Sequence, residues 1–446
     1  MRHFLPLLLL AACTTTPAPT PAADAGGIVD PLSMPAQATV DLNAVPSAET
    51  CKPCHPRQAA EWSGSRHAYS MRDPVFQALV GARHAAFAGE QDKFCVQCHS
   101  IAGVRSLAVA PGFEFAVLPP VPMEGVTCWS CHAAASIARL HNAGLVMATD
   151  GAMRGNLAQP MANPQHGTQA AGFLQSAEFC GTCHEVVELH GLPLERPLSE
   201  WQDSPAALAG QSCADCHMPK YDDVAAVGGP QRTGLRSHRF VGLDPPGARE
   251  ATTAAEQADW AAQRDALLAT AATVTVAPGP VKPGGTLTVA VTVQNKIAGH
   301  SLPTGSTFIR QCWLEVRAVA ADGKVLYESG NFDANDDLRD RWSALAPYGD
   351  ADLVSFSSAF VDGKGQPTLF PWLATEHHRN QLRAGEKRTY SYFVPVPADV
   401  TGPVQLTARL RLRTYPPFLV RLLGLDAALP TVLLTDLATD ATAVSL

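Results

Sequence analysis

Five copies of the pattern Cys-x-x-Cys-His constrain this sequence more than any other feature. Ten of its twelve cysteines belong to them. Two thiols at this spacing reach the two vinyl groups of one porphyrin, and the histidine that follows then lies under the iron as an axial ligand. The pattern therefore predicts five covalently bound haem c groups. The copies are Cys51, Cys54 and His55; Cys95, Cys98 and His99; Cys128, Cys131 and His132; Cys180, Cys183 and His184; and Cys213, Cys216 and His217.

Other uses of paired cysteines explain the pattern less well. Two Cys-x-x-Cys pairs can form a zinc site, and one pair can form a thioredoxin-like redox centre. Neither explains why a histidine follows every pair, and a disulfide framework fails for the same reason. Outside the pattern, Cys312 lies in an apolar run (QCWLEVRAVA), where we expect a buried small hydrophobic residue.

The first residues, MRHFLPLLLLAAC, predict export. A short basic start and an apolar run too short to span a bilayer are typical of a signal peptide, here residues 1–12. The run from Leu10 to Cys13 resembles a bacterial lipobox, which implies lipidation of Cys13; an ordinary cleaved signal with an incidental cysteine is the alternative. Thr14 resembles the pattern of lipoproteins sorted to the outer membrane. Residues 13–46, rich in Thr, Pro and Ala, predict a flexible tether.

The rest of the chain divides near residue 250. All five motifs lie in residues 47–250, and their first cysteines are 44, 33, 52 and 33 positions apart. Such intervals leave no room for an apolar protein core, so we expect short helices and loops wrapped around haems. Residues 251–272 are rich in Ala and predict a connecting helix in which Trp260, Leu267 and Leu268 share a face.

Residues 273–446 carry alternating β-branched positions separated by turn signals such as PGPVKPGG and RAGEK. This pattern predicts an all-β sandwich of immunoglobulin-like type, and hence an α + β protein of two domains. The strands we expect are Thr273–Ala277, Thr286–Gln294, Cys312–Val319, Lys324–Glu328, Arg388–Val396 and Gln405–Arg413.

Longer stretches carry a family resemblance. The order CKPCH…EWSGSRHAYS, EGVTCWSCH, SAEFCGTCHEV, LSEWQDSPAALAGQSCADCHMPK and RSHRFVG resembles multihaem cytochromes related to the nitrifier tetrahaem cytochrome c and to hydroxylamine oxidoreductase. The segment QNKIAGHSLPTG, with its GHxxPTG motif, resembles a β-domain that follows the haem region in many bacterial multihaem proteins. The resemblance covers most of residues 48–420. It implies extracytoplasmic electron transfer and leaves the partners open.

The sixth ligand of each iron decides its role, because a second histidine favours electron transfer and an open position admits a substrate. Nine mature histidines outside the motifs compete for five places. The resemblance implies His67 and His238. We also expect His166, in a loop rich in Gly, Pro and Asn, and His300, in the Gly299–Gly305 turn, where ligation would join the two domains.

The fifth place stays open. His141, His190 and His84 are candidates, with His141 favoured by its position. Methionine would raise the potential as a sixth ligand, and Met71, Met153 and Met161 are weaker candidates. His377 and His378 are expected at the surface or at an interface.

The net charge of −8 disfavours a nucleic-acid partner. We therefore expect a periplasmic or cell-surface electron carrier, anchored by lipid to the outer membrane, whose partners are other cytochromes or an outer-membrane conduit. The alternative is a reductase or dehydrogenase of small nitrogen or sulfur compounds with one five-coordinate haem. Against it, no motif carries the lysine found at the active haem of pentahaem nitrite reductases. A docking role of the β-domain is compatible with the electron carrier.

Overall fold

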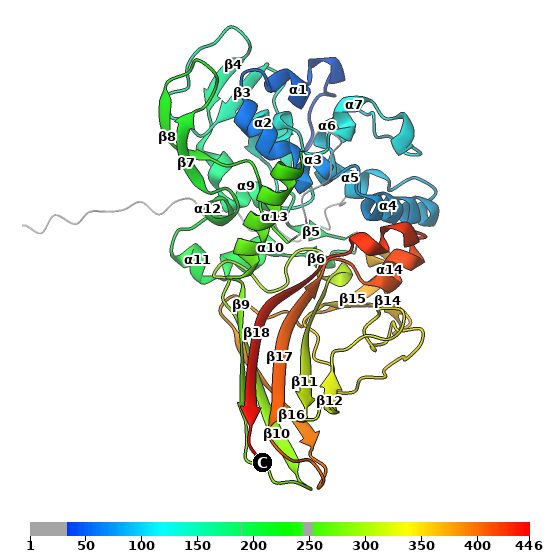
Figure 1. The fold of residues 1–446 in the computed structure, drawn as a ribbon. Coiled ribbons are helices and arrows are strands. Elements are labelled where there is room, and N and C mark those ends of the chain that lie inside the picture. Colours follow the sequence, from blue (N-terminus) through cyan, green and yellow to red (C-terminus); the bar gives the residue numbers. More distant parts are fainter. Residues whose placement is uncertain (1–33, 189, 244–252) are drawn as a thin grey trace, which may run out of the picture.

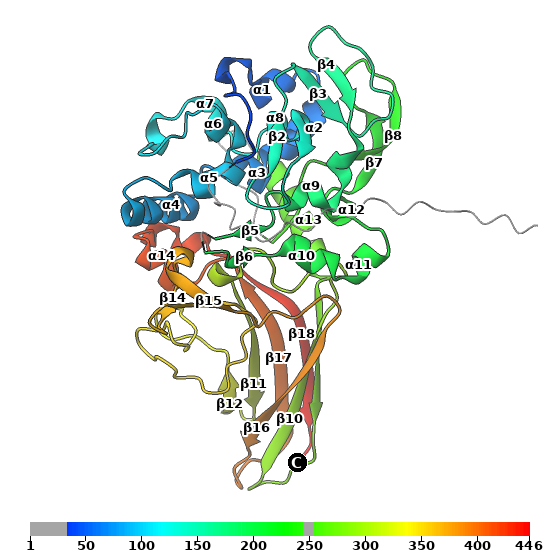
Figure 2. The same ribbon diagram turned by 180° about the vertical axis from the view of Figure 1, so that it is seen from behind.

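The computed structural model describes residues 34–188, 190–243 and 253–446, so Cys13 and the predicted signal peptide lie outside the described residues. Figure 1 shows short helices and small sheets gathered at one end and long strands extending from the other. Figure 2 shows the same division from behind, with α10 and β6 at the junction. No helix in the described part of the chain is long and apolar enough to cross a bilayer.

Short helices dominate the first half, as the motif spacing predicts. Five of them begin with a proline, whose fixed backbone angle and missing N–H suit the first helical position. Thr127 and Ser212 form capping boxes ahead of the third and fifth motifs. The helices are α1 (Ala48–Cys51), α2 (Pro56–Ser63), α3 (Arg66–Tyr69), α4 (Pro74–Phe87), α5 (Lys93–His99), α6 (Ile101–Arg105), α7 (Pro120–Met123), α8 (Cys128–His132), α9 (Ala177–Gly181), α10 (Pro197–Gln202), α11 (Pro205–Leu208) and α12 (Cys213–His217).

Small two-stranded sheets between these helices were not predicted. They form where the chain turns back on itself between motifs, and the strands are too short to give a periodic sequence signal. The pair β3–β4 is parallel and the other three pairs are antiparallel. The strands are β1 (Ala134–Ile137), β2 (Leu145–Met147), β3 (Ala152–Gly155), β4 (Gly167–Ala170), β5 (Val186–Val187), β6 (Pro193–Glu195), β7 (Lys220–Val224) and β8 (Gln231–Arg236).

Residues 34–46 do not form the flexible tether that their composition predicts. This segment packs against the haem region, because Val40 and Val45 are buried in an apolar cluster with Trp129. The backbone N–H of Val40 donates to the Arg105 carbonyl at 2.9 Å. A Thr- and Pro-rich composition hides these two apolar anchors, so the predicted boundary at residue 46 is wrong for the described part of the segment.

The helix α13 (Ala254–Leu268) connects the two regions, as predicted. Thr253 caps its start through a capping box with Glu256. The buried positions are Trp260, Arg264 and Leu268, one helical turn apart, whereas Leu267 is only half-buried. The buried face therefore includes an arginine that the apolar pattern did not indicate.

The second half contains two main antiparallel sheets, in the strand orders β16-β10-β9 and β12-β11-β17-β18. Their inward side chains alternate along each strand and share one apolar core, which includes Val289 of β10, the predicted buried Cys312 and Leu410 of β17. A small third sheet, order β14-β13-β15, and one helix lie near the junction (Figure 1). The elements are β9 (Ala272–Pro278), β10 (Thr286–Asn295), β11 (Gln311–Val319), β12 (Val325–Ser329), β13 (Ala359–Asp362), β14 (Pro367–Thr368), β15 (Ala374–His378), β16 (Lys387–Pro395), β17 (Val404–Arg413), α14 (Pro417–Leu422) and β18 (Leu434–Val444).

Candidate haem-ligating centres

Eight histidines form four close pairs, each joining one motif histidine to one histidine from elsewhere in the chain. All four of the motif-external members, His67, His166, His238 and His300, were predicted as ligands from the sequence. The ring centres are 6.4 Å apart for His55 and His166, 6.1 Å for His67 and His184, 6.1 Å for His132 and His238, and 6.2 Å for His217 and His300.

This spacing is what a shared metal ion requires. An imidazole nitrogen binds iron or zinc at about 2.0 Å, and the ring centre lies about 1.1 Å behind that nitrogen, so two ligands on opposite sides are about 6 Å apart. Rings that pack directly on each other are closer, as Phe76 and His99 are at 3.8 Å. The four pairs thus leave room for an iron and fit bis-histidine haem.

Hydrogen bonds orient the rings in the same sense. A backbone carbonyl can only accept, so a ring Nδ1 beside one carries the hydrogen and leaves the Nε2 lone pair for a metal. Metal-binding histidines commonly show this arrangement. The Nδ1–carbonyl distances are 2.7 Å for His55 to Ala225, 3.1 Å for His99 to Ser70, 2.5 Å for His132 to Arg154, 2.9 Å for His166 to Gly167, 2.6 Å for His217 to Val241, 3.0 Å for His238 to Arg236 and 2.8 Å for His300 to Ser301.

Burial keeps several of these rings neutral. Loss of solvent lowers the pKa of His67 to about 3 and the pKa values of His99, His238 and His300 to about 4. The same cause lowers the pKa values of His132 and His184. A neutral imidazole is the form that binds a metal, so the ligand state is present at neutral pH.

The remaining motif histidine, His99 of the second motif, has a different environment. It belongs to none of the four pairs given above, and Phe76 stacks on its face at an interplanar angle of 5°. An apolar cluster around Met71 packs against Cys95 of the same motif. Ring pairing among the described residues therefore assigns no sixth ligand to the second motif.

The candidates for that place are spread around the site. The backbone of Ala143, two residues after His141, contacts the Cys98 thiol, so His141 stays a prediction. Met71 is fully buried in the cluster against Cys95, whereas Met161 is exposed. His84 is half-exposed, with its Nδ1 bonded to Asp92 at 2.9 Å, and His190 is exposed.

The motif cysteines form one contiguous cluster. All described cysteines are free thiols, as thioether formation requires. Thiols of different motifs contact each other, which places the first site beside the third, the second beside the fourth, and the fourth beside the fifth. The contacts join Cys51 to Cys128, Cys98 to Cys183, and Cys180 to Cys213, and Cys131 lies within electrostatic range of Cys183.

His300 comes from the β-region, and carboxylates of the haem region hold its loop in place. Glu200 of α10 accepts the Ser301 N–H at 3.1 Å and the Thr304 hydroxyl at 2.6 Å. Glu195 of β6 accepts a further hydrogen bond from the Ser306 hydroxyl. Sequence reasoning missed these two acids, because nothing local to either indicates a partner a hundred residues away.

Comparisons with known proteins agree with this geometry. Residues 50–133, which include the first three motifs, match the family model described as "Cytochrome c554 and c-prime". The crystal structure of a penta-heme cytochrome c552 from Thermochromatium tepidum matches with a TM-score of 0.62 at 19% identity, over 90% of this chain and 100% of that one. The five motifs, the matched segment and the shared fold together support a multihaem c-type cytochrome.

Other structural matches to this cytochrome are partial. A putative beta-galactosidase from Bacteroides fragilis covers 39% of the chain and 16% of its own length at 9% identity, with a TM-score of 0.17. Spo0M from Bacillus subtilis covers 39% and 49% at 11% identity, with a TM-score of 0.15. Neither score supports an argument about the fold. No curated protein matches the sequence.

Proposed function

We propose that this cytochrome carries five haems and transfers electrons between redox partners. The observation that carries the proposal is the set of four histidine pairs at 6.1–6.4 Å, each with one motif histidine. A haem held by such a pair would have an imidazole on each side of its iron, which would leave no place there for a substrate. Bound haem supplies a reversible one-electron couple at each site. The chain's own residues hold the sites side by side and orient the ligand rings.

The sixth ligands that we assign are His166, His67, His238 and His300, for the first, fourth, third and fifth motifs in that order. Electron paramagnetic resonance of the oxidised protein tests the assignment. Four low-spin bis-histidine haems are expected, and replacing any one of the four residues by alanine should remove one of them. A spectrum with fewer than four such haems, or variants without effect, would refute it.

A second function is favoured by the environment of His99. The sequence predicted, as an alternative, a reductase or dehydrogenase of small nitrogen or sulfur compounds, which requires one open haem. His99 is the motif histidine that belongs to none of the four pairs, and apolar side chains lie around the site. Titration with nitrite or hydroxylamine distinguishes the two functions. A high-spin signal from one haem that shifts on titration supports the enzyme, and five low-spin haems exclude it.

We further infer that the protein is related to the nitrifier tetrahaem cytochrome c and hydroxylamine oxidoreductase group, and that its β-region is an immunoglobulin-like sandwich. The second inference is supported by two antiparallel sheets of three and four strands around one core. Of the seven strands in these two sheets, the first, second and fifth along the chain form one sheet and the other four form the second. This order suits an immunoglobulin-like fold. The first sheet contains β9, β10 and β16, and the second contains β11, β12, β17 and β18. An experimental structure of the region would test it.

Location and partners follow from the sequence. Lipidation of Cys13 would anchor the protein at the outer membrane, facing the periplasm or the cell surface. Other cytochromes or an outer-membrane conduit would then exchange electrons with it. Crosslinking in cells followed by mass spectrometry tests this proposal, and recovery of no haem protein among the crosslinked partners would count against it.

A further inference from the structure

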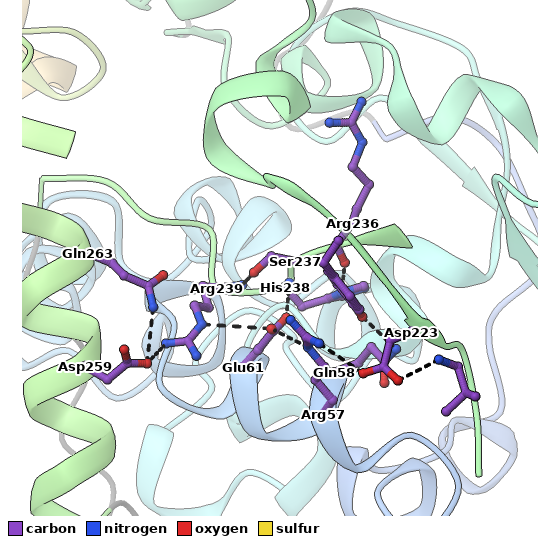
Figure 3. A network of polar contacts seen from close by, with 12 residues as sticks. Arg57, Gln58, Glu61, Asp223, Arg236, Ser237, His238, Arg239, Asp259 and Gln263 are labelled. Carbon is purple, nitrogen blue, oxygen red and sulfur yellow. Dashed lines mark hydrogen bonds and ion pairs between the residues drawn. The ribbon is translucent and has the colours of Figure 1, made fainter. Parts of the chain in front are cut away.

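A buried carboxylate, that of Glu61, lies next to the backbone of His238. The role proposed for it below rests on the proposed ligation of the third haem by His132 and His238. Glu61 belongs to α2, which begins directly after His55 of the first motif. Its Oε2 accepts the backbone N–H of His238 at 2.7 Å. Figure 3 shows Glu61 at the centre of a polar network that spans α2, β8 and α13. One carboxylate therefore fixes the segment that carries a distal histidine.

The second oxygen of Glu61 is engaged by two arginines. Arg57 Nε donates to Oε1 at 3.1 Å, and Arg239 Nε lies 3.9 Å from the same oxygen. Each arginine also pairs with an outer acid, Arg57 with Asp223 and Arg239 with Asp259. These five groups carry two positive and three negative charges, so the network as a whole is negative by one.

Solvent screens the members of this network unequally. The side chains of Arg57, Asp223 and Asp259 are 44%, 40% and 53% exposed and that of Arg239 is 24% exposed, whereas that of Glu61 is 6% exposed. Charges in contact with water interact weakly over distance, and a buried charge is screened much less. The charge that a group bound at His238 senses most strongly in this network is thus that of Glu61.

We propose that Glu61 is a positioning residue that both holds His238 and lowers the reduction potential of the haem bound between His132 and His238. Loss of one electron at that site adds a positive charge beside the carboxylate, which favours the oxidised form. The hydrogen bond to the His238 backbone and the charge effect can be tested separately, because a neutral side-chain amide accepts the same hydrogen bond without carrying the charge.

The test compares Glu61→Gln with Glu61→Ala in the haem-loaded protein. Glu61→Gln keeps an acceptor and loses the charge, so one of the five midpoint potentials should rise while the low-spin spectrum stays as in the wild type. A tenfold larger ratio of reduced to oxidised haem at fixed potential is expected, which is about 59 mV for one electron. Glu61→Ala also loses the acceptor and should additionally shift the low-spin signal of that haem.

Glu376→Gln is the matched control, because that β15 side chain is 62% exposed and its loss changes the net charge equally. Spectroelectrochemistry in which Glu61→Gln leaves all midpoints unchanged, or moves them as the control does, overturns the proposal. His238→Ala identifies the haem concerned. If that variant loses no low-spin signal, the ligand assignment is wrong. That result is distinct from a Glu61→Gln variant whose midpoint potentials are unchanged, which refutes only the role of Glu61.

Discussion

Replacement of His300 by alanine tests whether the β-region completes a haem site. The His300 ring is half-buried and its centre lies 6.2 Å from that of His217, with the two planes 17° apart. Removing it takes one imidazole from four pairs, so three bis-histidine haems should remain. The matching new signal should be one high-spin haem.

The structure also gives the cost of this change to stability. The lost ring hydrogen bond to the Ser301 carbonyl contributes about 1 kcal/mol, to which loss of the axial bond adds. The bonds from Ser301 and Thr304 to Glu200 do not involve the ring and should keep the loop in place. Because the loop keeps its shape, added imidazole should enter the vacated space and restore the low-spin signal.

Electron paramagnetic resonance, with and without imidazole, measures both effects. His378→Ala is the control, since that histidine belongs to the same region and its side chain is 63% exposed. If His300→Ala keeps four bis-histidine haems, His300 only supports its turn. If high-spin haem appears but imidazole has no effect, the loop does not hold its shape without the ring.

Three further predictions concern stability and anchoring. Glu188→Ala should destabilise the protein by about 3–5 kcal/mol in thermal denaturation, because it leaves Arg83 unpaired in a site where both side chains are at most 2% exposed; a small change would mean that solvent reaches the arginine. Burial lowers the pKa of His377 to about 4, so the unfolded chain takes up the proton first and stability should fall as the pH drops from about 6.5 to 4. His377→Asn should remove up to roughly 3 kcal/mol of that fall, measured as unfolding free energy against pH, and an unchanged slope would contradict the assignment. Cys13→Ser should release the protein from membranes on fractionation, and continued sedimentation with membranes would exclude lipidation as the anchor.

The strands of the two main sheets show which structure is readable from sequence. The six predicted strands agree with β9, β10, β11, β12, β16 and β17 within one residue at each end, because apolar and polar residues alternate along them. The strand β18 was missed. Leu437 is its one fully buried side chain, and its Asp and Ala residues have low strand propensity, so its position depends on pairing with β17.

The ligand set divides in a similar way. A motif histidine is identified by its own neighbours in sequence, because the thioether chemistry is local. The pairing of His67 with the fourth motif joins residues more than a hundred positions apart and skips three motifs that are nearer in sequence. No sequence spacing encodes such a choice, since it depends on how the chain folds around all the sites together.

A local structural signal separates ligands from other histidines more sharply than sequence position does. The paired rings of His166, His238 and His300 hydrogen-bond through Nδ1 to a carbonyl and so present Nε2. His377 shows the same arrangement, with Nδ1 2.9 Å from the Pro193 carbonyl and a buried Nε2, yet no histidine ring of the described chain faces it at pair distance. The orienting hydrogen bond is thus shared by ligands and by a histidine that joins two regions. Only the second ring, about 6 Å away, distinguishes them, and that requirement is what leaves His99 as the exceptional site.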